Sequence, residues 1–340
     1  MLRYFDVMIL ETSLVASADS PFGGVKIALT VDDLFQWKGV PPIKGYEPAS
    51  IVRCLTDAFA GHAVSGVYAF SNTAPIDDQR SLARVFDHWT ERGHFTGNHT
   101  HNHASLNWLT PKAYIDDIER TERLIAVWTA QAPVLYFRHC FDMWGDTLVK
   151  KEAVAAYLQR TGYAVAPISL WFYDAQFCVP YLRAMQCDDH EALSWLRKCF
   201  VETACKQLAT QTAAARLMFG RDPAHIWLIH GTPIASDCIG EILDAFAARG
   251  VQFISLEEAM RDPMNQQQPL VTPLFRNQVQ KWAETKGVVI EDTPPAILKR
   301  LDDVCPLPGM SGDQLFSSLL STMATGAGAE VDLSKFRLDI

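Results

Sequence analysis

Histidine is concentrated in one short segment of the chain. The heptapeptide GNHTHNH, residues 97–103, contains His99, His101 and His103, although the whole 340-residue chain has only 10 histidines. Such a segment could be a polar surface loop. It could also be a metal site in which the first and last imidazoles are the ligands. The choice between these two interpretations depends on residues elsewhere in the chain.

Further polar side chains follow apolar, strand-like segments. Asp32 and Asp33 follow KIALTV, Arg138 follows LYF, and His230 follows IWLI. Taken alone, each has an ordinary interpretation, such as a helix cap, an ion-pair partner or a polar residue with a local hydrogen bond. Together with the histidine cluster they favour one shared site, because parallel α/β barrels place catalytic groups at the C-terminal ends of their strands.

One carboxylate and two neutral imidazoles would leave coordination positions of a metal open for water and substrate. Zinc is the default ion for such a set, and cobalt, nickel, manganese and iron are alternatives. A bound ion of this kind lowers the pKa of water from 15.7 to about 7 and polarises a carbonyl group. Adjacent strand residues point to opposite sides. A bend at the strand end would therefore be needed to bring both Asp32 and Asp33 to the cleft, one as a ligand and the other as a base.

The elements that must position these residues alternate between strand and helix up to about residue 260. This alternation predicts parallel strands joined by right-handed crossovers, and six or seven such units favour a barrel over an open sheet. No GxGxxG or GxxxxGK[ST] motif follows a strand, so nucleotide-binding alternatives lose their main support. The expected strands are 26–31, 66–70, 135–138, 164–170, 225–230 and 251–256, and the expected helices are 48–60, 77–93, 110–128, 148–161, 189–219 and 239–250.

The sequence divides into three parts. Residues 1–24 form an N-terminal segment, residues 25–263 a catalytic barrel, and residues 264–340 a C-terminal extension that begins after a linker-like run of glutamines. In the extension, the spacing of apolar residues predicts a helix over 275–286. We expect this helix to pack over the barrel mouth or against a second subunit, which leaves a homo-oligomer open, and we expect the extension to restrict access to the site. For the last ~15 residues, a disordered tail is the alternative.

Composition excludes several classes of protein. With 49% apolar and 20% charged residues, the chain can form a large core, and a net charge of −9 without a basic cluster argues against nucleic-acid binding. No run approaches the ~20 apolar residues of a membrane span.

The eight cysteines form no CxxC pair, which favours reduced, mostly buried thiols and a cytoplasmic location. Residues 1–18 imitate a signal peptide, but Asp6 and Glu11 interrupt its apolar stretch, so a periplasmic or secreted location is the alternative.

Four segments, in this order, resemble motifs of the polysaccharide deacetylases, the NodB-homology group also called carbohydrate esterase family 4: TVDD, HTHNH, FRHCF and LIH. The resemblance covers about residues 26–260 and implies a distorted (β/α)7 barrel. It also implies that Asp32 is the general base and that Asp33, His99 and His103 hold a divalent metal. His101 is then an additional histidine between two ligands.

The later motifs imply the remaining roles. Arg138 would steady the base, the backbone N–H of Phe141 would help to hold the oxyanion, and His230 would be the general acid, with Asp174 as its partner. Two motifs depart from the family pattern. Cys140 replaces a proline in the third motif, and in WFYDAQF, Trp171 and Ala175 stand where an acidic residue and a tryptophan are usual.

The resemblance implies a metal-dependent hydrolase that removes an acyl group, most simply acetyl, from an N-acylated amine, with a carbohydrate-type substrate. In this mechanism Asp32 takes a proton from the attacking water and His230 protonates the departing amine. The altered motifs keep open an amide or imide hydrolase of allantoinase type that acts on a small molecule. An inactive, metal-containing glycan-binding module is a further alternative, although such a module would not need both a base and an acid.

Overall fold

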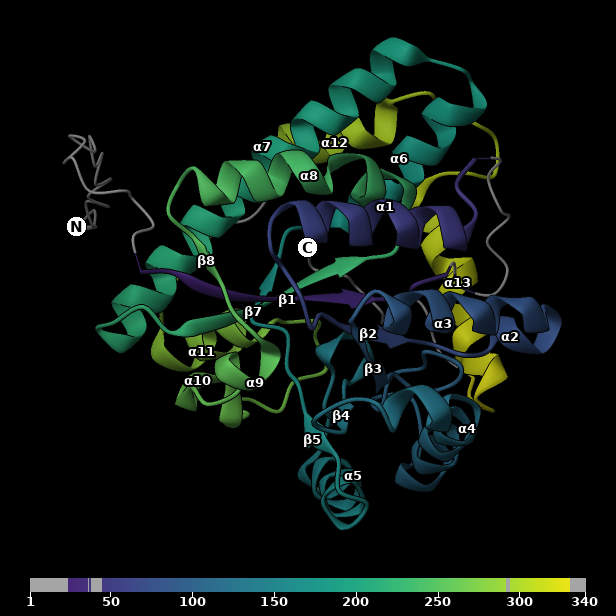
Figure 1. Cartoon of the computed structure of the whole chain (residues 1–340), viewed down its shortest axis with the longest axis vertical. Helices are drawn as coiled ribbons and strands as arrows, with labels where there is room; N and C mark the ends of the chain where they lie inside the picture. Colours follow the sequence, from purple (N-terminus) through teal and green to yellow (C-terminus); the bar gives the residue numbers. More distant parts are fainter. Residues whose placement is uncertain (1–23, 36, 38–44, 292–293, 331–340) are drawn as a thin grey trace, which may run out of the picture.

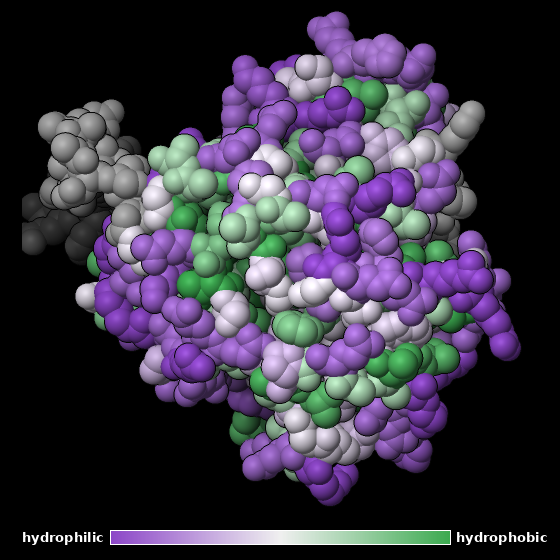
Figure 2. All heavy atoms as spheres, viewed as in Figure 1, coloured by the Kyte–Doolittle hydropathy of each residue, from purple (hydrophilic) through white to green (hydrophobic). Residues whose placement is uncertain are grey.

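The computed structural model describes residues 24–35, 37, 45–291 and 294–330. The predicted N-terminal segment, residues 1–24, therefore lies outside the described residues except for Gly24. Within the described ranges no helix is both long and apolar enough to span a membrane. All eight cysteines are free thiols. The face in Figure 2 is predominantly hydrophilic, with smaller hydrophobic areas between the polar side chains.

The described strands form one curled parallel sheet in the order β5-β4-β3-β2-β1-β7-β6. β1 pairs with β7 along its whole length on one side, and on the other side with β8 near its start and with β2 near its end. The curled sheet, with helices around it, confirms the predicted distorted (β/α)7 barrel (Figure 1). The strands are β1 (Lys26–Asp32), β2 (Tyr68–Ser71), β3 (Phe95–Asn98), β4 (Tyr136–Phe137), β5 (Ala164–Val165), β6 (Leu170–Trp171), β7 (Ala224–His230) and β8 (Gln252–Phe253).

Several helices of the barrel, among them α1, α4, α5 and α7, lie close to where the apolar periodicity and the capping residues place them. Thr110 caps α4 by accepting a hydrogen bond from the Ala113 N–H, and Pro111 occupies the first helical position, where no N–H is needed. In Figure 1, α1 and α8 lie side by side over the sheet. The helices are α1 (Pro48–Gly61), α2 (Pro75–Asp78), α3 (Arg84–Glu91), α4 (Pro111–Thr129), α5 (Leu148–Arg160), α6 (Asp174–Gln186), α7 (His190–Phe219), α8 (Pro233–Ala247) and α9 (Leu256–Ala259), with 3-10 turns η1 (Arg80–Ala83) and η2 (Cys140–Asp142).

Several expected elements were wrong in their extent. The helix expected over 239–250 is α8, which begins already at Pro233 after its cap Thr232, and the strand expected over 251–256 is limited to β8, because α9 begins at Leu256. The predicted helix 77–93 is divided into α2, η1 and α3. The predicted strand 164–170 is two short strands, β5 and β6, which pair at opposite ends of the sheet path. Pro167 lies between them and has no N–H to donate to a sheet ladder, which explains why one continuous strand does not form.

β1 lies in the centre of the sheet and alternates its side chains between two cores. Ile27, Leu29 and Val31 belong to the core beneath the outer helices, whereas Ala28 faces the barrel interior beside aromatic residues of the neighbouring strands. Thr30 and Asp32 follow the same alternation and are buried inside the barrel. β1 therefore places the Asp32 carboxyl group inside the barrel, at the C-terminal end of the strand.

The C-terminal extension is folded onto the barrel through α10 (Pro263–Gln266), α11 (Gln278–Lys286), α12 (Pro295–Asp303) and α13 (Gly312–Gly326). The expected helix 275–286 begins only at Gln278, because Asn277 is its cap. It packs against α7 rather than over the barrel mouth. Residues 312–326 form α13, which Figure 1 shows beyond the arrowheads of β1 and β7. Residues 331–340, which make up most of the end for which a disordered tail was the alternative, lie outside the described residues.

Candidate active site

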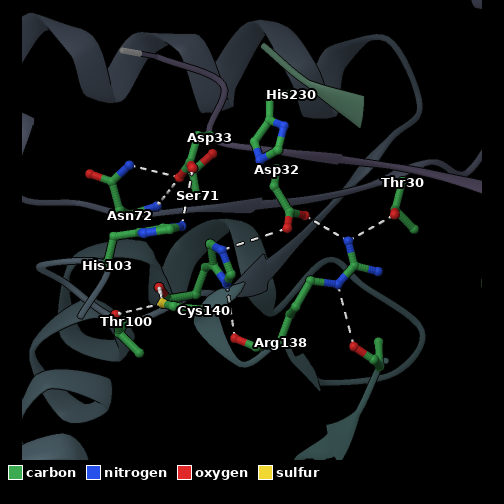
Figure 3. Close-up of polar contacts among 12 residues, drawn as sticks. Thr30, Asp32, Asp33, Ser71, Asn72, Thr100, His103, Arg138, Cys140 and His230 are labelled. Carbon is green, nitrogen blue, oxygen red and sulfur yellow. Dashed lines mark hydrogen bonds and ion pairs between the residues drawn. The ribbon is translucent and has the colours of Figure 1, made fainter. Parts of the chain in front are cut away.

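β1 brings both aspartates to one cleft because the chain bends directly after it. Asp33 adopts a left-handed backbone conformation, with φ of 51°. Its N–H donates to the Phe70 carbonyl oxygen at 2.8 Å, which fixes the bend. The bend that the sequence required is therefore present, and it turns the Asp33 carboxylate toward the same cleft as that of Asp32 (Figure 3).

Arg138, at the end of β4, holds the Asp32 carboxylate inside the barrel. One guanidinium nitrogen donates to Asp32 Oδ1 at 2.6 Å and to Thr30 Oγ1 at 2.8 Å. The guanidinium lies 4.2 Å from the centre of the Phe70 ring, and Arg138 is 0% exposed. Burial raises the pKa of Asp32 to about 7, although the charge of Arg138 lowers it. Asp32 is thus a fixed carboxyl group with a pKa close to neutral, as a general base requires.

Asp33 is held by neutral donors on one oxygen and faces a histidine with the other. Oδ1 accepts hydrogen bonds from the Asn72 backbone N–H at 3.1 Å and from its side-chain amide at 2.7 Å. Oδ2 accepts from Trp37 Nε1 at 2.6 Å and lies 3.3 Å from His103 Nε2. The carboxylate is therefore oriented by hydrogen bonds from Asn72 and Trp37, as metal-ligating carboxylates are by neighbouring donors.

His99 is oriented in the same way. Its Nδ1 lies 2.9 Å from the Arg138 carbonyl oxygen, so this nitrogen carries the proton, and Nε2 is left facing Asp32, whose Oδ2 lies at 3.6 Å. Burial lowers the pKa of His99 to about 3. The rings of His99 and His103 lie 4.8 Å apart. Two buried imidazoles with a carboxylate beside them form a donor set suited to a divalent metal ion.

The identity of the third ligand is the one point at which the geometry offers a choice. Within the described residues, the ligand atoms of His99, His103 and Cys140 lie within 4.8 Å of one another. The Cys140 thiol donates to the His99 carbonyl oxygen at 3.4 Å, and burial raises its pKa well above the usual range. The Asp33 carboxylate, whose Oδ2 lies 3.3 Å from His103 Nε2, is the alternative third ligand. Nδ1 of His103 has no hydrogen-bond partner among the described residues.

His230, at the end of β7, is paired with Asp174 at the start of α6. Its Nδ1 lies 3.1 Å from both carboxylate oxygens of Asp174, and its backbone N–H donates to Asp174 Oδ2 at 2.6 Å. Burial opposes protonation of His230, but its ion pair and hydrogen bond with Asp174 raise its pKa to about 9. Trp171, which stands where the family pattern predicted an acidic residue, donates to Asp174 Oδ1 at 2.7 Å and so helps to orient it.

Phe141 lies in the turn η2, which has an uncommon backbone conformation. Phe141 and Asp142 have φ of 57° and 49°, and both are non-glycine residues in the left-handed region. Lys281 of α11 stabilises this turn, because its Nζ donates to the Asp142 carbonyl oxygen at 2.6 Å and to Oδ2 at 2.9 Å. Both charged side chains are 1% exposed. No local pattern in the sequence indicates the contact of Lys281 with Asp142, because the two residues are 139 positions apart.

His101 points away from the cleft. Its Nδ1 lies 2.8 Å from Thr73 Oγ1 and its Nε2 lies 3.1 Å from Asp77 Oδ2. Both ring nitrogens are therefore engaged in contacts with α2 and the loop before it. The structure brings His99 and His103 together and places His101 outside the cluster.

A small cavity of about 70 Å³ opens directly on these groups. Side chains of the candidate site form one wall, and side chains of the C-terminal extension form another. We call it the apolar chamber. Its lining residues are Asp32, Trp37, His99, His103, Phe141, Ile168, Trp171, Ala175, Gln176, Leu228, His230, Phe275, Phe316, Leu319, Leu320 and Met323.

Several solved structures are similar to the chain. The chitin deacetylase from the fungal pathogen Colletotrichum lindemuthianum is 18% identical, over 73% of this chain and 92% of its own, with a TM-score of 0.48. The catalytic domain of the peptidoglycan N-acetylglucosamine deacetylase from Eubacterium rectale is 17% identical, over 77% and 99%, with a TM-score of 0.46. A CE4 family pseudoenzyme from Bacillus anthracis is 12% identical, over 71% and 66%, with a TM-score of 0.47. No curated protein sequence matches the chain.

The sequence model of the polysaccharide deacetylase family matches residues 20–161. This range contains the aspartate pair, the histidine cluster and the Arg138 motif, which are the segments that carried the resemblance in the sequence. His230 and Asp174 lie beyond it. Over residues 20–161 the chain is therefore similar in sequence to the polysaccharide deacetylase family.

Proposed function

We propose that this protein is a metal-dependent hydrolase that removes an acyl group, most simply acetyl, from the nitrogen of an N-acylated amine. One observation carries the proposal. Asp32 and His230 are partners in the register of β1 and β7, and both line the apolar chamber together with His99 and His103. A base and an acid therefore face each other beside a set of metal-ligating side chains, which is the arrangement that amide hydrolysis requires.

Different side chains of the protein would carry out different parts of the reaction. Asp33, His99 and His103 would hold the metal ion. When bound, this ion would acidify a water molecule and polarise the acyl carbonyl group. Asp32 accepts the proton of the attacking water, and Arg138 keeps its carboxylate in place.

The remaining groups would stabilise or neutralise the charge that develops on the substrate during the reaction. The Phe141 N–H, presented by the left-handed turn, would donate to the oxygen that becomes negative. The His230 imidazole, held by Asp174, would protonate the departing nitrogen. An N-acetylated sugar is the substrate type that the family suggests, and a small amide is the alternative that the apolar chamber favours.

The first test is metal content. The purified protein is expected to bind about one divalent ion per chain, measured by elemental analysis after dialysis. His99→Ala, His103→Ala and Asp33→Ala should each abolish stoichiometric binding, because each removes one of three ligands. The matched controls are His101→Ala and Cys140→Ser, which should keep the ion. Loss of the ion in Cys140→Ser together with its retention in Asp33→Ala would assign the third position to the thiol instead.

The role of His230 can be tested with two leaving groups. His230→Ala should lower kcat on amides by about 10²–10⁴-fold, because a departing amine needs a proton. An activated aryl ester should be much less affected, since its phenolate leaves without protonation. Asp174→Asn should show the same difference between amide and ester in weaker form. Equal losses on the two substrates would contradict the assignment of His230 as the general acid.

A further inference from the structure

The helix α13 turns its apolar face toward the catalytic groups. Phe316, Leu319, Leu320 and Met323 are spaced as i, i+3, i+4 and i+7, so they share one face of the helix. All four line the apolar chamber, opposite Asp32 and His230. An amphipathic helix usually buries such a face against the core of its own protein. Here the face forms one wall of the space in which the proposed reaction takes place.

α13 is fixed at both ends, so this wall is part of the folded structure. At its start, Ser311 and Gln314 form a reciprocal capping box, and the residue before it, Met310, accepts a hydrogen bond from Arg183 of α6 at 3.2 Å. At its end, Gly326 lies so close to Asn102 that a side chain there would collide with the Asn102 amide. The end of the helix therefore rests directly on the loop that carries His99 and His103.

The barrel side of the chamber is also apolar. Ile168, Leu228 and Phe275 contribute only carbon atoms from their side chains, and Trp171 uses its N–H on Asp174. Apart from the candidate catalytic and metal-binding groups and Trp37, the only polar side chain in the lining is that of Gln176. Its Oε1 is buried without a hydrogen-bond partner among the described residues, and it can accept one hydrogen bond from a ligand.

A second, more polar compartment adjoins the chamber on the other side of Met323. It contains Asn72, Asn102 and Thr322 in its lining, but it shares only Trp37, His103 and Met323 with the apolar chamber. Asp32, Phe141 and His230 do not line it. A bond that is to be cleaved between the base and the acid must therefore lie in the apolar chamber.

We infer that the substrate is a small amide with an apolar body, such as an N-acylated aromatic or branched aliphatic amine, rather than an N-acetylated glycan. The inference rests on the proposed hydrolase function. A sugar ring carries several hydroxyl groups, and each hydroxyl group buried without a partner weakens binding. Outside the proposed catalytic and metal-binding groups, the described residues of the chamber wall offer one buried acceptor without a partner, Gln176 Oε1, for all of them. The apolar part of a substrate binds favourably to the same wall, because the transfer of apolar surface out of water lowers the free energy.

The experiment compares matched amides on the full-length, metal-loaded protein. N-acetylbenzylamine and N-acetylcyclohexylamine are the apolar members, and N-acetylglucosamine and its β-1,4-linked tetramer are the polar members. Binding is measured by calorimetry, and hydrolysis by release of free amine. We expect kcat/KM to be at least 100-fold higher for the apolar amides.

A variant of the wall tests the cause. Leu319→Asn places an amide on the apolar face of α13 and is expected to raise KM for the apolar amides about tenfold or more, with unchanged metal content and little change in kcat. Ser317→Asn, on the exposed side of the same helix, is the matched control and should behave as the unmodified protein. If Leu319→Asn leaves KM unchanged, the wall does not contact the substrate and the inference fails.

The remaining outcomes separate this inference from the proposed function. Faster cleavage of the N-acetylglucosamine tetramer than of the apolar amides would overturn the apolar-substrate inference and leave the hydrolase standing. Binding of the apolar amides without release of amine from any compound would overturn the hydrolase itself.

Discussion

Asp32→Asn is expected to lower kcat by about 10²–10⁴-fold, because asparagine cannot accept the proton of the attacking water. The size and shape of the side chain are preserved, so its oxygen can still accept the hydrogen bond from Arg138. Metal content should remain at the level of the unmodified protein, since Asp33 and the two histidines are intact. The measurement is single-turnover and steady-state hydrolysis of one amide with metal content determined on the same sample.

A control is needed because the substitution also removes the negative charge beside a buried guanidinium. Thr30→Val removes a different hydrogen bond of Arg138, the one to Thr30 Oγ1 at 2.8 Å, and leaves the Asp32 carboxylate in place. We expect Thr30→Val to lower stability but to reduce kcat far less than Asp32→Asn. A metal-loaded Asp32→Asn protein with kcat within tenfold of the unmodified protein would remove Asp32 from the role of base.

Lys281→Met is expected to destabilise the folded protein. It leaves the Asp142 carboxylate buried without the ammonium group that now lies 2.9 Å away. Removing one partner of a buried ion pair typically costs about 3–5 kcal/mol of unfolding free energy. Chemical denaturation measures this loss. The matched control is Lys286→Met, on the same helix but exposed, for which a change within ~1 kcal/mol is expected.

The same substitution should also affect catalysis. Lys281 donates to the carbonyl oxygen of Asp142, directly after Phe141, whose N–H is the proposed oxyanion donor, so loss of this contact allows the left-handed turn to relax. Loss of one oxyanion donor typically lowers kcat by about 10²–10³-fold. We expect a fall in kcat with little change in KM at a temperature where the variant is folded. If Lys281→Met matches Lys286→Met in stability and kcat, the ion pair does not hold the turn.

The sequence predicted the barrel well because its signals are local. Apolar runs, helix caps and strand-end polar residues lie within short windows, and the register of parallel strands then brings Asp32 and His230 together. α6 was missed for a physical reason. Nine of its residues are buried, among them an internal Pro180, so neither periodicity nor propensity indicates a helix. Its stability comes from packing on α7 and α8.

Other parts of the candidate site could not be derived from local patterns. The pair of Asp142 and Lys281 joins distant segments and leaves no periodic trace. Trp171 was treated as a departure from the family motif, whereas the structure shows that its indole orients Asp174. α13 did carry a local signal, the capping box of Ser311 and Gln314, but small residues with weak propensities masked the helix that follows.

The position of α13 has a consequence for protein synthesis. The chamber needs Asp32 from the first strand and Met323 from the last described helix, and about 290 residues separate them, which a ribosome adds in about 15–60 s at ~5–20 residues per second. Throughout that interval the nascent barrel carries its base and its histidines without the wall that faces them. An incomplete chain therefore lacks the enclosed pocket, and selectivity for a substrate is acquired only when the final helix emerges and docks.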